Sequence, residues 1–221
     1  MSAAEWRIIA FTLQVAALST LVIAPLALGV AWLLARYRWP GKSVVETLVM
    51  LPLVMPPVAT GLILLKLLGR RSSVGGLLDR AGVEVIFTWR AVVAAMMVMS
   101  FPLLVRGCRV AFEEINVRLE QVAKTLGASD ARVFFTISLP LARRGIVGGL
   151  VLAFARAIGE FGATIIVAGN IPGRTQTLAL AIYERVQLGH DTEAYRLLAV
   201  AVLIAFAALW TSEAMLRSKV R

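Results

Sequence analysis

The sequence contains little charge, one cysteine and one histidine. Charged residues make up 16% of the 221 residues, whereas an ordinary soluble domain has about 25%. The single cysteine, Cys108, excludes an internal disulfide, and there is no cluster of His and Cys to form a metal site. We therefore expect a chain that is not a soluble domain and that binds no metal or cofactor itself.

The motifs of nucleotide hydrolysis are also missing. Gly41, Lys42 and Ser43 match the end of a phosphate-binding loop, but that pattern needs a glycine where this chain has Arg36, and a strand before it. The Gly-x-Ser-x-Gly turn of serine hydrolases does not occur. We expect the chain not to be an enzyme, so the energy for any active process has to come from another protein.

Long apolar runs are the main feature that the sequence does have. Apolar residue types make up 59% of the chain, and the mean hydropathy is +0.83. Because a membrane span needs about 20 apolar residues, we expect an all-α, multi-pass membrane protein with one domain over residues 8–215. The expected spans are 8–35, 44–68, 91–105, 145–169 and 197–209.

Prolines predict interruptions in these spans. Pro56 and Pro57 remove two adjacent backbone donors from the second span, which favours a break near the middle of the membrane. Pro102 is expected to break the third span, and Pro140 to end a helix before the fourth. A broken span could line a pore or could be accommodated by helix packing, and the sequence favours neither.

The basic residues predict an orientation. Lys and Arg are modestly more frequent in the loop 36–43, the segment 113–144 and the C-terminal tail than on the other side of the spans. The positive-inside rule then places these three parts in the cytoplasm and the N-terminus outside. Membrane orientation accounts for most of the net charge of +10, so we expect lipid, and not nucleic acid, as a partner.

A basic amphipathic segment, 113–144, stands between the third and fourth spans. Apolar residues recur three and four positions apart in 118–126, which predicts a short helix with its polar residues facing water. Gly127 is placed to end this helix in a left-handed conformation, and Ser129 or Asp130 can cap a second helix. The apolar face comprises Leu119, Val122, Ala123 and Leu126, and the polar face Glu120, Gln121, Lys124 and Thr125. A connector lying on the bilayer surface is the alternative.

The spacing in this segment resembles the cytoplasmic signature of importer-type permeases of ATP-binding cassette (ABC) transporters. That signature is Glu-Ala-Ala, three residues, Gly, nine residues and Ile-x-Leu-Pro; Gln121 and Val122 replace its first two residues here. The resemblance implies a coupling helix that sits in a cleft of an ATPase subunit. It assigns this contact to Glu120, Gln121, Val122, Ala123, Lys124, Thr125, Leu126, Gly127, Ala128 and Ser129, supported by Ile137, Leu139 and Pro140.

The stretches 39–43, 51–57, 99–106, 132–146 and 155–178 resemble the molybdate type within this class. The resemblance implies the type I importer fold with about five transmembrane helices, in the plasma membrane. It also implies two copies around a pore, two ATPase subunits that use ATP and Mg²⁺, and an external oxyanion-binding protein. The alternatives are a tungstate, sulfate or thiosulfate permease and, from another class, a membrane scaffold or enzyme without a transport role.

A path for a tetrahedral dianion should offer hydroxyl groups and a modest positive potential without a tight cationic trap. The candidates are Pro56, Pro57, Ser100, Arg156, Glu160 and Thr164. Two alternatives stay open. The hydroxyls of Ser100 and Thr164 could bond to their own helices, and Arg156 and Glu160, four residues apart, could form an ion pair that only holds the bundle together.

Overall fold

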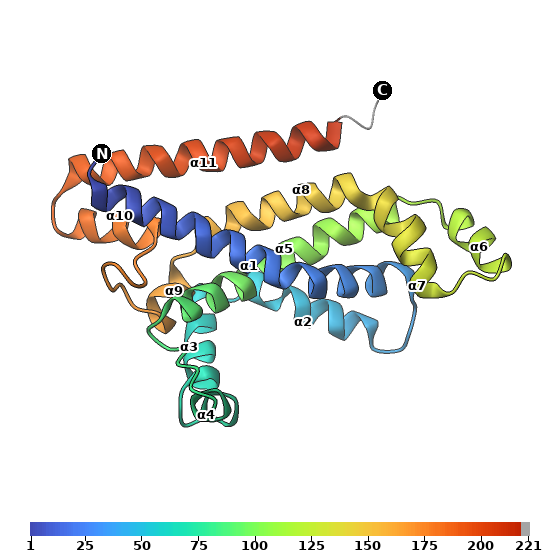
Figure 1. Ribbon diagram of the computed structural model, residues 1–221, viewed down its shortest axis with the longest axis horizontal. Helices are drawn as coiled ribbons and strands as arrows, with labels where there is room; N and C mark the ends of the chain where they lie inside the picture. The colour runs from blue at the N-terminus through green and yellow to red at the C-terminus, as the bar shows by residue number, and fades with distance from the viewer. Residues whose placement is uncertain (218–221) are drawn as a thin grey trace.

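The computed structural model describes residues 1–217, and every regular element in that range is helical (Figure 1). In chain order the elements are α1 (Ala3–Arg36), α2 (Lys42–Val54), α3 (Pro57–Leu68), α4 (Ser73–Arg80), α5 (Trp89–Glu113), α6 (Val117–Thr125), α7 (Asp130–Val133), the π-helical segment η1 (Phe134–Ser138), α8 (Leu139–Ile158), α9 (Gly162–Val167), α10 (Leu178–Gln187) and α11 (Asp191–Arg217). Within the described range, four helices are long and apolar enough to cross a membrane, or five spans if the bent pair α2 and α3 is one of them. This agrees with the predicted five spans.

The helices α1, α5 and α8 form the core of the bundle, and α11 packs on α8. Small residues bring α5 and α8 close together. A Cβ on Gly145 would lie 2.5 Å from the Cβ of Ala111, and one on Gly107 would lie 3.1 Å from the Cα of Gly149. Since lipid provides no hydrophobic drive for helix pairing, this close approach supplies the van der Waals contact that holds the two spans together.

The two ends of the bundle differ. The N-terminus lies at the end opposite α6, and α11 runs from the N-terminal end back toward the end that carries α6 (Figure 1). The predicted cytoplasmic tail beyond Arg217 lies outside the described residues.

Two of the predicted proline interruptions are wrong. Pro102 lies inside α5, which continues for 25 residues. Pro140 does not end a helix either, because α7, η1 and α8 run on without a gap from Asp130 to Ile158. In η1 the backbone N–H of Leu139 donates to the carbonyl of Phe134, five residues back. This wider turn places Pro140 in the first turn of α8, where a missing N–H costs little.

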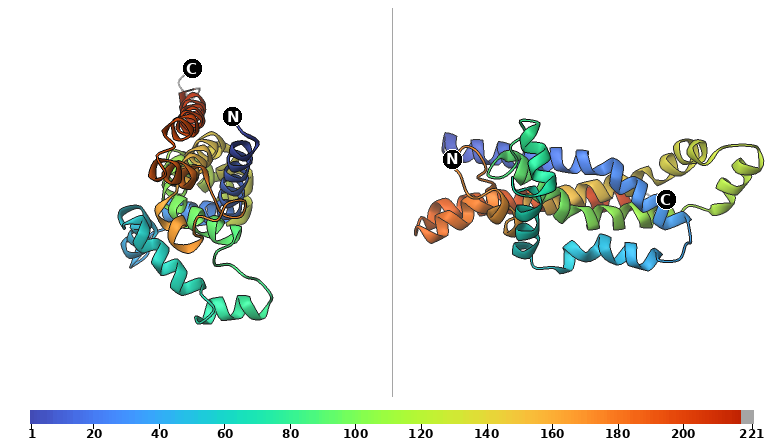
Figure 2. Two further views of the ribbon diagram at one scale, coloured as in Figure 1. Left: turned by 90° about the vertical axis from the view of Figure 1, so that its left-hand side faces the viewer. Right: turned by 90° about the horizontal axis from the view of Figure 1, so that it is seen from below.

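The predicted break at Pro56 and Pro57 is confirmed, and it is a sharp one, since α2 and α3 meet at 110°. The predicted fourth span is also broken, because α8 ends at Ile158 and α9 begins at Gly162. The two short helices that follow these breaks, α3 and α9, pack against each other. Beyond this contact, α3 and α4 form an arm that projects sideways from the bundle (Figure 2).

Candidate functional site

The segment around α6 has the predicted order of helix, glycine turn and helix. The side chain of Asn116 accepts a hydrogen bond from the backbone N–H of Arg118, which starts α6. Gly127 has φ +87°, and the following N–H, of Ala128, donates to the carbonyl of Ala123 at 3.0 Å. Most residues with a side chain would be strained at Gly127, so this position favours glycine, with asparagine as the best-tolerated replacement. Of the two predicted caps, Ser129 is the one that accepts from the second helix.

The prediction that Glu120 faces water is wrong. Its side chain is 7% exposed, and its carboxylate pairs with Nε of Arg36, the last residue of α1, at 2.7 Å. The hydroxyl of Ser138, in η1, donates to the same carboxylate at 2.8 Å. The carboxylate therefore joins α6 to α1 and to η1, the segment that leads into α8. A buried carboxylate needs such partners because removing a charge from water is otherwise costly.

A second ionic link lies on the surface beside the first. The ammonium group of Lys124 contacts a carboxylate oxygen of Asp130 at 2.6 Å, and the phenol of Tyr37 donates to the other oxygen at 3.0 Å. The hydrogen bond that Lys124 donates to Asp130 raises the pKa of Lys124, and burial raises the pKa of Tyr37. Both groups therefore keep their protons at neutral pH, and the link persists there.

With Glu120 buried, three large apolar residues of the α6 region are exposed together with its other polar residues. The exposed fractions are 49% for Leu119, 58% for Val122 and 83% for Leu126. The polar residues Gln121, Lys124 and Thr125 are exposed beside them. An exposed apolar patch with a polar border is typical of a surface that another protein covers. In the rest of the signature, Leu139 packs on the bundle core, Ile137 is half-buried and Pro140 is exposed.

The candidates for the substrate path gather around the two breaks, with Ser100 as the exception. Pro57 begins α3, and a Cβ on Gly162, the first residue of α9, would lie 2.6 Å from the Cβ of Pro57. A Cβ on Gly61 would lie 2.8 Å from the carbonyl oxygen of Ala163. These two glycines let α3 and α9 touch backbone to backbone. The breaks in two different spans thus form one contact, which we call the α3–α9 crossing.

Arg156 and Glu160 form the ion pair that their spacing predicted, with 2.7 Å between Nη1 and Oε2. The expectation that both lie inside a helical span is wrong for Glu160, which follows the end of α8. Its other oxygen, Oε1, accepts from the backbone N–H of Ala163 at 2.9 Å, and the side chain is fully buried. Glu160 therefore ties the end of α8 to the start of α9 across the break.

The hydroxyl groups near the path differ in their partners. Ser100 donates to the carbonyl of Met96 at 2.6 Å, which is the alternative in which it bonds to its own helix. The hydroxyl of Thr164, in α9, is buried without a hydrogen-bond partner among the described residues, and so is that of Thr60, in α3. Thr60 was not among the path residues predicted from the sequence. Its position between Pro57 and Gly61, in a span predicted to be broken, could have indicated it.

Comparisons with known proteins identify the family. The model of the binding-protein-dependent transport system inner membrane component matches residues 8–217. The chain belongs to this family. Chains from solved structures of ABC transporters share its fold. Over 99% of both chains it superposes with a TM-score of 0.75 and 18% identity on a chain of the MetNI methionine ABC transporter, described as inward-facing.

A second solved structure and several relatives agree. A bacterial ABC transporter involved in the import of alginate gives a TM-score of 0.72 at 19% identity, over 98% of this chain and 80% of that one. The molybdenum transport system permease protein ModB of Escherichia coli is 46% identical over 96% of this chain and 94% of its own length. ModB of Haemophilus influenzae is 46% identical over 95% of this chain and 92% of its own length. The predicted type I ABC importer fold is confirmed.

Proposed function

We propose that the chain is the permease subunit of an ATP-driven importer that carries a tetrahedral oxyanion, molybdate, across the plasma membrane. The observation that carries this proposal is the 46% identity to two molybdenum permeases over almost the full length of each. A probable sulfate permease of Chlorokybus atmophyticus is 38% identical, but over 62% of its length. Sulfate, thiosulfate and tungstate are therefore the second choice of substrate.

In this proposal the coupling helix is α6, and it docks on an ATPase subunit that supplies ATP hydrolysis with Mg²⁺. The support is the exposed apolar patch of the α6 region, with Leu126 at its tip, and the rigid attachment of the helix through Glu120. Two copies of the chain form the pore, each with one ATPase subunit, and an external oxyanion-binding protein delivers the substrate. ATP shifts the population between the states that open to either side, since it binds them with different affinities.

We place the substrate path at the α3–α9 crossing. Its two unpartnered hydroxyls, on Thr60 and Thr164, can donate to an oxyanion when the two helices separate. Arg156 adds a positive charge, and the buried Glu160 offsets it. An uncompensated cation would hold a dianion too tightly to release it, whereas this pair leaves a modest attraction.

The coupling helix is tested at Gly127. Gly127→Asp adds charge and bulk at the tip of the docking surface, next to Leu126. We expect the variant to insert in the membrane but to lose copurification with the ATPase and ATP-driven molybdate uptake. Gly127→Asn is the matched control, because asparagine tolerates the left-handed conformation and carries no charge. Normal uptake by the Asp variant would refute the assignment of α6.

The substrate is tested by competition in proteoliposomes that contain the complete transporter and its binding protein. We expect molybdate to compete with labelled molybdate at far lower concentrations than sulfate does. Equal competition by sulfate would mean that the transporter accepts tetrahedral dianions in general and does not select molybdate.

A further inference from the structure

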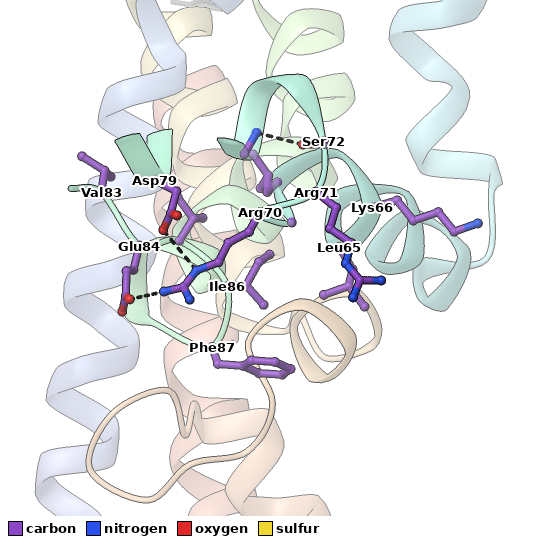
Figure 3. Close-up of a pocket in the computed structure, with 14 residues that line it drawn as sticks. Leu65, Lys66, Arg70, Arg71, Ser72, Asp79, Val83, Glu84, Ile86 and Phe87 are labelled. Atoms are coloured by element: carbon purple, nitrogen blue, oxygen red, sulfur yellow. Dashed lines mark hydrogen bonds and ion pairs between the residues drawn. The ribbon is translucent and has the colours of Figure 1, made fainter. Parts of the chain in front are cut away.

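A large cavity lies outside the proposed path, on the arm made by α3 and α4. Its volume is about 840 Å³, and it lies between the end of α3, the start of α4 and the loop 83–87 (Figure 3). Its walls are largely apolar, and its border carries several charged groups. The apolar lining residues are Leu65, Leu68, Val83, Val85, Ile86 and Phe87.

The charged groups of this cavity are divided into two sets. Arg70 pairs with Asp79 at 3.1 Å and also with Glu84, so these three side chains satisfy one another. Lys66 and Arg71 point away from both carboxylates, on the opposite side of the cavity (Figure 3). In residues 1–217 neither has an acidic partner within ion-pairing distance. The cavity therefore has an apolar interior and one border with two uncompensated positive charges.

The cavity is built from a fixed backbone. The hydroxyl of Ser72 accepts from the N–H of Gly75 and caps α4. A Cβ on Gly75 would lie 2.2 Å from the carbonyl oxygen of Gly69, so α4 packs directly on the end of α3. On the other wall, the N–H of Phe87 donates to the carbonyl of Val167 in α9 at 3.2 Å. The two walls are thus held in place by contacts that do not involve a ligand.

The position of the cavity relative to the membrane follows from the neighbouring span. Trp89, two residues after the lining residue Phe87, begins α5, which is a candidate span. Trp89 is 44% exposed, and the guanidinium of Arg90 lies 5.2 Å from its ring centroid. Tryptophan and arginine at the end of a span mark the level of the lipid headgroups. The arm leaves the bundle sideways at this level (Figure 2), with Leu62 and Leu77 exposed along it.

We propose that this cavity binds an anionic phospholipid from the leaflet at the N-terminal end of the bundle. The phosphate group of the lipid lies between Lys66 and Arg71, which can both donate charge-assisted hydrogen bonds to it. One acyl chain follows the apolar wall at Ile86 and Leu65. A small soluble anion would leave this apolar volume unfilled, whereas a lipid matches both the charge of the border and the apolar character of the interior.

The experiment begins with the complete transporter in nanodiscs that contain phosphatidylglycerol and phosphatidylcholine. After extraction from the nanodiscs, native mass spectrometry measures which lipid the transporter has retained. We expect the wild-type protein to retain phosphatidylglycerol preferentially. The double variant Lys66→Gln and Arg71→Gln should lower this retention about tenfold, since two surface cations have lost their attraction to an anionic headgroup. Arg80→Gln is the matched control, because Arg80 is a basic residue of the same arm that does not line the cavity.

Ile86→Trp tests the interior, because it fills the apolar wall without changing the charge. It should lower retention of phosphatidylglycerol as much as the double variant does, while uptake of molybdate is measured separately. Equal retention of both lipids by the wild-type protein, or an equal loss in Arg80→Gln, would overturn the proposal. So would displacement of the lipid by glycerol 3-phosphate alone, which would indicate a soluble anion, or a crosslink joining α4 of two copies through this cavity.

Discussion

The α6 region and the α3–α9 crossing are both contacts between separate helices, but different forces hold them. At α6, charged side chains make the contact: Glu120 reaches Arg36 across 84 positions of sequence. At the crossing the contact is steric, and Gly61 and Gly162 bring two backbones together. Charges tolerate changes of shape around them, whereas a backbone contact allows no added atom. The two regions should therefore fail under different substitutions.

The largest effect is expected at Glu120. Glu120→Gln leaves Arg36 buried without a charge partner, which costs on the order of 3–5 kcal/mol. Thermal unfolding of the purified protein in detergent measures this loss. Glu113→Gln removes a half-exposed carboxylate that pairs with Arg109 on the same side of the molecule, and it should change stability by less than about 1 kcal/mol. Equal losses in the two variants would mean that the buried pair does not hold α6.

The crossing should be the more sensitive of the two regions to added volume. In Gly61→Ala the new methyl group would lie 2.8–2.9 Å from backbone atoms of Ala163, and overpacking of this kind costs about 1–3 kcal/mol. Gly29→Ala is the control. Gly29 lies in α1, and a Cβ at this position would have no neighbouring atom within 4 Å. We expect the control to keep the wild-type melting temperature. A Gly61→Ala protein as stable as the control would show that the crossing can open without cost.

Thr164→Val separates stability from transport. The hydroxyl of Thr164 has no hydrogen-bond partner in the described part of the chain, and replacing an unsatisfied buried group by a methyl group should raise stability by about 1 kcal/mol. If the hydroxyl serves the oxyanion, the same variant transports more slowly, with a change in the rate of uptake and no loss of the ATPase. A more stable variant with unchanged uptake would remove Thr164 from the path.

The smallest effect is expected for Ser100→Ala. The hydroxyl of Ser100 is buried, but it returns to the carbonyl of Met96 in its own helix, so its removal should cost below about 1 kcal/mol and leave uptake unchanged. Uptake that falls by tenfold or more, at unchanged expression, would return Ser100 to the path. Ser100 would then contact the substrate in a conformation of the protein other than the one described.

The sequence predicted the number of spans, the break at Pro56 and the turn at Gly127 because each depends on local chemistry: apolar length, missing donors and backbone freedom. It also predicted the ion pair of Arg156 and Glu160, which are neighbours on one turn. It was wrong about Glu120, which it placed on the water-facing side of α6, because the partner of Glu120 lies in α1, far away in the sequence. It was also wrong about Pro140, because periodicity alone does not indicate a π-helical turn.

The gap between α8 and α9 could not be predicted from apolar length, since residues 145–169 are apolar almost throughout. Glu160 was visible as a charge in that run, and its backbone contact with Ala163 gives the physical reason for the break. A buried carboxylate that accepts a backbone N–H can replace the helical bond that the chain gives up there. Thr60 was not predicted, although the break in its span was, because the sequence does not show that α3 packs on α9 and buries this hydroxyl.

The π-helical turn at Phe134–Ser138 makes the stretch from Asp130 to Ile158 a single shaft of 29 residues. One end of this shaft is clamped to α6 through Ser138 and Glu120, and the other ends at the gap that Glu160 bridges. A displacement applied at α6 would therefore act on one continuous helical stretch that ends at this gap. A movement of a protein docked on α6 would then act on the hydrogen bond between Glu160 and Ala163.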